Sequence, residues 1–218
     1  MDTKFRNTVK LFQKLPGVGP RQAARFILAL LEKDESELKE LGQAIVNLKK
    51  DIRLCKECFS LSENGLPGQE GNCHICSDPK RDHGKLLVLE KVTDLDSIEK
   101  TGLYKGLYHV LGGSINPLDG ATQETLRFKE LEKRVDQMTE ALRPLQQVQG
   151  KQAQSDNLEL IVATNPTATG ETTSLYIKDL LKNKSGLTIT RLGRGLASGS
   201  HLEYIDETTI RNALEYRK

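Results

Sequence analysis

All four cysteines of the chain fall in one stretch, as two Cys-x-x-Cys pairs: Cys55 with Cys58, and Cys73 with Cys76. Thiols at this spacing can form disulfides, act as a redox centre, bind a metal ion, or belong to a contact surface. No apolar signal segment is visible in "MDTKFRNTVK", so we expect a cytoplasmic protein whose thiols stay reduced. Two Cys-x-x-Cys turns fill the four positions of tetrahedral Zn²⁺ and leave none open for water. The sequence therefore predicts a structural zinc site, with a metal-free or redox role as the alternative.

The residues around the cysteines fit this interpretation. The loop between the pairs contains Asn64-Gly65 and Pro67-Gly68, which are turn residues of the kind a knuckle needs. His74 lies inside the second pair, and we expect it to be a bystander because four thiolates already close the site. Such a site stabilises a segment too small to have its own core.

A second candidate site is the stretch "LPGVGP" at residues 15–20, where Gly17 and Gly19 flank a valine. Apolar residues at helical spacing lie on both sides of it, which predicts a helix, a tight glycine hairpin and a helix that starts near Pro20. Backbone N–H groups at that helix start suit a phosphate, and Arg21 and Arg25 share one helix face. We therefore predict a hairpin that grips nucleic-acid backbone without reading bases. The alternative is an ordinary helical hairpin with two solvated arginines.

A third helix is predicted after the hairpin, because apolar residues recur at a spacing of three and four: Leu38, Leu41, Ile45, Leu48 and Ile52. Asp34 or Ser36 could cap it. We expect this seam to form the core of the hairpin unit, with an oligomer contact as the alternative.

Beyond residue 82 the pattern changes to strands that alternate with helices. Strands are predicted at "KLLVLE", "GLYHVL", "LELIVAT" and "LTITRL", and amphipathic or polar helical segments separate them or follow them. This order predicts a mostly parallel sheet with helices on its faces. Functional residues of such sheets sit beyond the carboxyl ends of the strands, which here means Glu90 and "TNPTATGE".

Composition narrows the class of protein. Of the 218 residues, 28% are charged and 37% are hydrophobic, which fits a globular chain rather than a disordered one. The longest apolar run, "FILALL", is far too short to span a bilayer. The net charge of +2 gives no strong indication of a nucleic-acid partner by itself.

Several motifs occur in a fixed order: "LPGVGP", the two Cys-x-x-Cys pairs ending in "CSDPKRD", "VLE", "YHVLGGSINPLDG", "ATNPTATGE" and "LEYIDETT". In this order the chain resembles the bacterial RecR family of recombination mediators over nearly its whole length. The resemblance implies an α+β multi-module fold: a helix-hairpin-helix module at residues 1–53, a four-cysteine zinc finger at 54–82, an α/β Toprim domain at 83–195 with an extended helical or linker insertion near 130–157, and a C-terminal strand and helix segment at 196–218.

The resemblance also implies a function. The family acts in recombinational repair of gapped DNA with RecO and RecF, and helps RecA load on single strands coated by the single-strand-binding protein. Its members form rings or clamps, so a dimer or tetramer is expected, cytoplasmic and associated with the nucleoid when bound to DNA. Cys55, Cys58, Cys73 and Cys76 match the zinc ligands, and Arg21 and Arg25 match basic hairpin positions implicated in DNA binding.

Glu90 and Glu171 match Toprim acidic positions that this family links to RecO contact rather than to catalysis. The chain departs from the family pattern at Thr169, where a glutamate is usual, and at His201, where an aspartate is common. Both departures remove negative charge near the functional edge of the sheet. A third departure is a longer, glutamine-rich connection before "LELIVAT", which we expect to be an extended helix and a flexible linker around residues 150–157.

Two other functions are alternatives to a non-catalytic DNA-binding mediator. A Toprim-type nuclease or topoisomerase-like enzyme needs paired aspartates to hold Mg²⁺, and the segment after the third strand contains no such pair. Glu171 fits the start of the next helix, where its charge suits the helix dipole. A phosphate-binding loop for ATP is also absent from the sequence. The second alternative is a protein-interaction scaffold without DNA binding.

Overall fold

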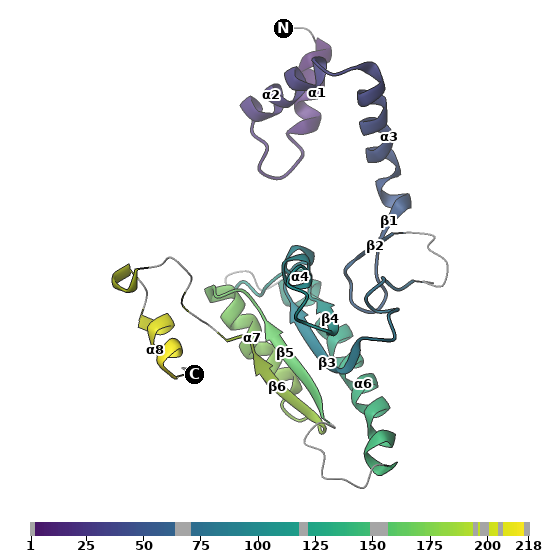
Figure 1. Cartoon of the computed structure of the whole chain (residues 1–218). Helices are drawn as coiled ribbons and strands as arrows, with labels where there is room; N and C mark the ends of the chain where they lie inside the picture. Colours follow the sequence, from purple (N-terminus) through teal and green to yellow (C-terminus); the bar gives the residue numbers. More distant parts are fainter. Residues whose placement is uncertain are drawn as a thin grey trace. The chain divides into compact units, whose positions relative to one another are not determined.

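The computed structural model describes residues 3–63, 71–117, 122–148, 157–193, 196, 201–204 and 207–215 (Figure 1). The chain divides into two compact units, Met1–Ile52 and Arg53–Lys218. Within the described residues, none of the helices combines the length and the apolar character needed to cross a membrane.

The N-terminal unit consists of three helices: α1 (Thr3–Phe12), α2 (Pro20–Leu31) and α3 (Glu35–Asp51). Gly17 has φ +77°, a left-handed conformation that glycine adopts without strain, and it turns the chain between α1 and α2. Pro20 occupies the first turn of α2, as predicted, because its missing N–H needs no acceptor there. Helices α1 and α2 pack through Phe12 and Phe26, whose ring centroids lie 6.2 Å apart. The predicted helix, glycine hairpin and helix are confirmed.

The expectation for the third helix was correct in its position and wrong in its packing. Asp34 is the N-cap of α3, and its N–H donates to Glu37 Oε2 at 3.4 Å. However, α3 has no buried residue, and all five residues of the predicted seam are exposed. Periodicity shows that one face is apolar but does not show what covers it. In the described part of the chain the seam is a surface rather than the core of the hairpin unit.

The second unit is built on a four-stranded parallel sheet of β3 (Asp82–Leu89), β4 (Gly106–Val110), β5 (Leu158–Ala163) and β6 (Leu187–Arg191). The strand order is β4-β3-β5-β6, so the chain first adds β4 on one side of β3 and then β5 on the other. The helices of this unit are α4 (Val92–Glu99), α5 (Thr122–Thr125), α6 (Phe128–Val148) and α7 (Ala168–Leu181). The predicted alternation of strands and helices and the parallel sheet are confirmed (Figure 1).

Each face of the sheet has its own apolar core, because successive side chains along a strand point to opposite faces. Leu86 and Val88 of β3 pack with residues of α6 and α7 on one face. Leu87 and Leu89 pack on the other face with α4 and with three of the four cysteines. The cysteine segment is therefore part of the core of the second unit rather than a separate appendage.

The remaining elements are the short strands β1 (Ile52–Leu54) and β2 (Leu61–Glu63), a 3₁₀ turn at Leu202–Tyr204, and α8 (Glu207–Glu215). The predicted C-terminal helix is thus confirmed. The predicted turns at Asn64-Gly65 and Pro67-Gly68 and most of the predicted linker around residues 150–157 lie outside the described residues. The helical part before that linker is α6.

Candidate functional site

The four cysteines form one cluster. Their sulfur atoms all lie within 4.8 Å of one another, and Cys58 Sγ is 3.5 Å from Cys73 Sγ. All four thiols are free, so the disulfide reading of the cysteines does not apply. In a tetrahedral zinc site with Zn–S bonds of about 2.3 Å, the sulfurs would lie roughly 3.8 Å apart. The cluster therefore has the dimensions of a closed four-thiolate metal site.

Local hydrogen bonds shape the two Cys-x-x-Cys turns. Phe59 N–H donates to Cys55 O at 3.1 Å, and Ser77 N–H donates to Cys73 O at 3.0 Å, which closes each turn. Cys73 N–H donates to Cys55 Sγ at 3.3 Å and so stabilises negative charge on that sulfur. A hydrogen bond from the Cys58 thiol lowers the pKa of Cys55. The Cys73 N–H thus favours the thiolate form of Cys55, which is the form that a metal ligand needs.

Phe59 follows the first turn with φ 60°, a left-handed conformation that is unusual for a residue with a Cβ. Its ring lies edge-on to His109 of β4 at 5.4 Å between centroids, and the Arg127 guanidinium lies 5.0 Å from the ring centroid. These contacts hold the ring against the sheet and offset the backbone strain.

This arrangement predicts that glycine at position 59 is more stable than alanine, the reverse of the order found in the middle of a helix or strand. Phe59→Ala and Phe59→Gly both lose the ring contacts and should destabilise the protein by about 2–4 kcal/mol. Glycine also relieves the left-handed strain, so Phe59→Gly should be about 1 kcal/mol more stable than Phe59→Ala. Urea unfolding of the two variants measures the difference. A less stable glycine variant would show that the backbone strain at Phe59 has no energetic weight.

Two arginines fasten the cysteine finger, by which we mean residues 53–63 and 71–81, to the sheet. Arg81 donates to both carboxylate oxygens of Glu99 on α4, at 2.8 and 2.7 Å, and lowers the pKa of Glu99. Arg134 of α6 donates to Glu57 O at 2.7 Å and to Tyr108 O of β4 at 2.5 Å. The finger is thus tied to α4, to β4 and to α6.

Arg21 and Arg25 lie on α2 after the glycine hairpin, one helical turn apart. Both side chains are exposed, and neither has an ion pair within the described residues. Gly19 is the N-cap of α2, and no atom lies within 4 Å of the position of a Cβ there. Pro20 has no N–H and the Ala23 N–H donates to Gly19 O at 2.9 Å, so the first-turn donors without an intrahelical acceptor are those of Arg21 and Gln22. The structure therefore brings together the two arginines, the helix start and both glycines on one accessible surface.

Glu90 lies at the carboxyl end of β3, and it is only 3% exposed. Its carboxylate accepts hydrogen bonds from Asn165 N–H at Oε1 and from Asn165 Nδ2 at Oε2, both at 2.8 Å. A Cβ at position 170 would overlap the Asn165 carbonyl oxygen and crowd Glu90 Oε1, which explains why glycine stands there. Glu90 therefore holds the loop after β5, and a partner at this edge would meet that loop before it met the carboxylate.

Glu171 lies at the same edge, in the first turn of α7. Arg191, at the end of β6, donates to its two oxygens at 2.8 and 3.1 Å. A cavity of about 490 Å³ opens along the ends of β3, β5 and β6, and Ile98, Val162 and Leu192 are among its apolar walls. Glu90 and Glu171 are thus on one edge of the sheet, but each already has a partner.

Because Glu90 accepts with both oxygens, Glu90→Gln places an amide donor against a donor of Asn165. We expect a loss of about 1–3 kcal/mol and faster hydrogen exchange at the Asn165 amide. Glu171→Gln is the matched control at the same edge, where a partly exposed ion pair contributes about 1 kcal/mol or less. Equal exchange rates at Asn165 in the two variants would contradict the role given to Glu90.

The sequence did not indicate Arg134 and Arg191 as site residues, and it placed Asn165 in the strand-end segment "TNPTATGE" without showing its contact with Glu90. Arg134 lies on the same helical stripe as Leu131, Val135 and Met138, which pack in the core. A charged residue on an otherwise apolar stripe is a signal of a buried polar contact, although it does not name the partner. Arg191 has no comparable local signal.

Comparisons with known proteins agree with these features. The Toprim domain family matches residues 84–193, the helix-hairpin-helix of RecR matches residues 5–49, and the C-terminal region of RecR matches residues 195–218. A protein named recombination protein RecR from Synechococcus elongatus is 40% identical over 96% of this chain and 93% of its own length. Proteins of the same name from Desulforapulum autotrophicum and Chlorobaculum tepidum are 37% and 38% identical, over 97% and 96% of this chain and 94% and 93% of their own lengths.

Proposed function

Because this chain belongs to the RecR family of recombination proteins, we propose that it is a non-catalytic, DNA-binding mediator of recombinational repair. In this role it works with RecO, and with RecF where RecF is a partner, to help load RecA on gapped or single-stranded DNA. The family places the chain in recombinational repair. The DNA contact, the partners and the absence of catalysis are the finer parts of the proposal.

One observation carries the DNA-binding part: Arg21 and Arg25 are exposed and without ion pairs in the described residues, next to the open N-terminus of α2. Two guanidinium groups and the first-turn N–H groups suit phosphate oxygens, and they carry no base-specific information. The tight turn at Gly17 and the empty space at Gly19 let a nucleic-acid backbone approach closely. The resulting grip is independent of sequence and sensitive to salt.

For the four cysteines we propose Zn²⁺. Four soft thiolates in a tetrahedral cluster suit zinc, and a site closed by four protein ligands has no position for a reacting water. Cys55, Cys58 and Cys73 are at most 1% exposed, which suits a structural rather than a reactive site. The ion would stabilise the finger that joins the chain of the hairpin unit to the sheet.

Self-assembly is the third part of the proposal. Among the described residues of the N-terminal unit, only Ala23 and Ile27 of α2 are buried. Large apolar residues of α2 and α3 stay exposed, such as Leu31, Ile45 and Val46 at 69%, 64% and 76%. A surface this apolar on a small helical unit is typical of a protein contact. A second copy of the chain is the partner that the family resemblance favours. Assembly would place several hairpins on one DNA, and multivalency would strengthen a weak individual grip.

We propose the carboxyl edge of the sheet as the contact for RecO. Glu171 is partly exposed there, and the cavity beside it offers apolar walls to a partner side chain. Thr164 Oγ1 lines this cavity and has no hydrogen-bond partner within the described residues. Glu90 would act through the Asn165 loop that it holds. Thr169 and the exposed His201 supply no negative charge, so Glu171 is the acidic contact of this proposal.

A non-catalytic role is supported by the chemistry of that edge. Glu90 is bonded to Asn165 and Glu171 is paired with Arg191, so the oxygens of both carboxylates already have partners other than Mg²⁺. Within the described residues, the four cysteines are the one group of three or more side chains placed to hold a metal ion together. Cleavage of DNA that requires Mg²⁺ and disappears in Glu90→Gln would favour a Toprim-type enzyme instead.

The experiment that tests the proposal combines two measurements on the full chain. Solution mass should correspond to a dimer or a tetramer. Binding to gapped DNA across a salt titration should weaken steeply with salt and strengthen when RecO is added. A monomeric protein that binds no DNA at low salt would support the interaction-scaffold reading.

A further inference from the structure

Arg134 stands out among the charged residues because its side chain is 7% exposed and lies against the cysteine cluster. It comes from α6, on the opposite face of the sheet from most of the cluster's apolar neighbours. Besides its bonds to Glu57 O and Tyr108 O, its Nη2 donates to Cys76 Sγ at 3.8 Å. Its Nε is also 3.8 Å from the partly exposed Glu57 carboxylate. One guanidinium therefore touches a thiol, the first Cys-x-x-Cys turn and β4.

The chemistry of the proposed metal site gives this contact a purpose. Four thiolates and one divalent ion carry a net charge of −2, and a buried charge needs a compensating partner. Donors to ligand sulfurs also tune metal affinity, and their loss typically costs about 10–100-fold.

We propose that Arg134 is a positioning residue for the metal centre: it compensates the tetrathiolate charge at Cys76 and, through Glu57 O and Tyr108 O, ties metal loading to the packing of the finger on β4. The inference rests on the proposed metal site. Arg134 would link α6 to the metal centre. Metal binding would then affect the packing of the sheet as well as the structure of the finger. Without the metal, the buried guanidinium of Arg134 would lose the charged centre that it compensates.

Two consequences follow from this coupling. Loss of the metal should loosen the finger from β4 and α6, so hydrogen exchange at Tyr108 and Val110 should rise when the metal is removed. Val110 N–H donates to Cys58 O at 2.9 Å, so its protection reports directly on the contact between β4 and the finger. Conversely, loss of Arg134 should weaken the hold on the metal even though all four ligands remain.

The test compares Arg134→Met, which removes charge and donors at similar length, with Arg81→Met. Arg81 is the matched control because it also fastens the finger to the sheet, through Glu99, but donates to no cysteine within the described residues. The full chains are loaded with Zn²⁺, and transfer of the ion to a chromogenic chelator is timed. Loading with Co²⁺ gives the thiolate-to-metal absorption band, which a purely structural role would not shift.

We expect Arg134→Met to release the metal about 10–100-fold faster than the parent and to shift the Co²⁺ band. Arg81→Met should lower stability but keep the parental release rate and band. Arg134→Lys keeps the charge but not the fork of donors, so it should fall between the parent and Arg134→Met, and it replaces that variant if Arg134→Met does not fold. Equal effects of Arg134→Met and Arg81→Met, or an unchanged band in both Arg134 variants, would overturn the inference. A parent that binds no stoichiometric metal would instead overturn the metal site itself.

Discussion

Replacing Arg21 and Arg25 together by alanine is expected to weaken binding to every DNA sequence by on the order of tenfold or more, and to flatten the salt dependence. Both side chains are exposed on α2 beside the hairpin of Gly17 and Gly19, where they can reach phosphates. Each lost phosphate contact lowers the slope of log K against log salt by about 0.7–0.9, so a pair should lower it by roughly 1.5 for every hairpin engaged. A salt titration of binding to gapped and duplex DNA measures both quantities.

The matched control is Lys129→Ala with Lys133→Ala. These residues also form an exposed basic pair one helical turn apart, but they lie on α6 in the second unit. The control removes the same net charge from the chain, so it separates a local grip from a general electrostatic attraction. We expect it to change the salt slope by far less than the hairpin variant does. Equal slopes in the two double variants would refute a grip located at the hairpin.

The second large effect is expected for Cys73→Ser. Cys73 is 1% exposed, its sulfur lies 3.5 Å from Cys58 Sγ, and its N–H donates to Cys55 Sγ. Serine supplies a weaker, harder ligand, so the bound metal should fall from about one ion per chain to nearly none. The cysteines pack with Tyr108 and Val110 in the core of the sheet. The loss should therefore cost several kcal/mol and lower Tm by about 10 °C or more.

His74→Ala is the matched control within the same Cys-x-x-Cys turn. His74 is exposed and is not part of the cluster of sulfur atoms, so its removal should leave metal content and Tm close to those of the parent. Elemental analysis after dialysis and a thermal melt measure the two properties. Full metal content in Cys73→Ser, or loss of metal in His74→Ala, would show that the ligand set is not the four thiolates.

The features predicted well from the sequence are those that depend on neighbouring residues. The hairpin at Gly17 follows from a glycine in the left-handed conformation, and the start of α2 follows from Pro20. The cysteine cluster follows from two short turns that each present two thiols. The alternation of strands and helices predicts the parallel sheet, and the ends of parallel strands place Glu90 and the loop after β5 at one edge.

The features that the sequence could not supply depend on contacts between distant residues. Glu90 and Asn165 are 75 residues apart, and their two hydrogen bonds explain why Glu90 is buried rather than presented at the surface. Arg134 and Cys76 are 58 residues apart, so the cation beside the thiolates is invisible to spacing and periodicity. The seam on α3 shows the opposite failure, because its periodicity is clear but its residues are exposed within the described part of the chain.

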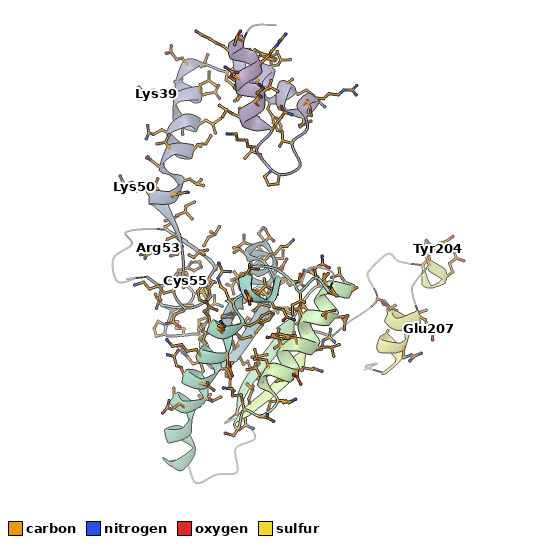
Figure 2. All side chains as sticks on the ribbon, turned by 180° about the vertical axis from the view of Figure 1, so that it is seen from behind. Lys39, Lys50, Arg53, Cys55, Tyr204 and Glu207 are labelled. Carbon is orange, nitrogen blue, oxygen red and sulfur yellow. The ribbon has the colours of Figure 1, made fainter. Side chains whose placement is uncertain are left out.

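The two units differ in the features that they carry. The N-terminal unit has exposed cations and an exposed apolar surface. In the second unit the cysteine finger and the sheet pack together as one body. Arg81 and Arg134 make the finger part of the sheet's structure, and the boundary between the two units falls between Ile52 and Arg53, where the finger begins. Figure 2 labels Arg53 and Cys55 along this stretch, after Lys39 and Lys50 of α3.

The most direct test of the proposed mediator function is RecA loading on gapped DNA coated with single-strand-binding protein, in the presence of RecO and Mg²⁺. We expect that this protein speeds RecA assembly, that Arg21→Ala with Arg25→Ala removes most of the gain, and that the DNA strands stay intact on a denaturing gel. No acceleration of RecA assembly by the parent protein, or DNA strands cut by the parent but not by Glu90→Gln, would contradict it.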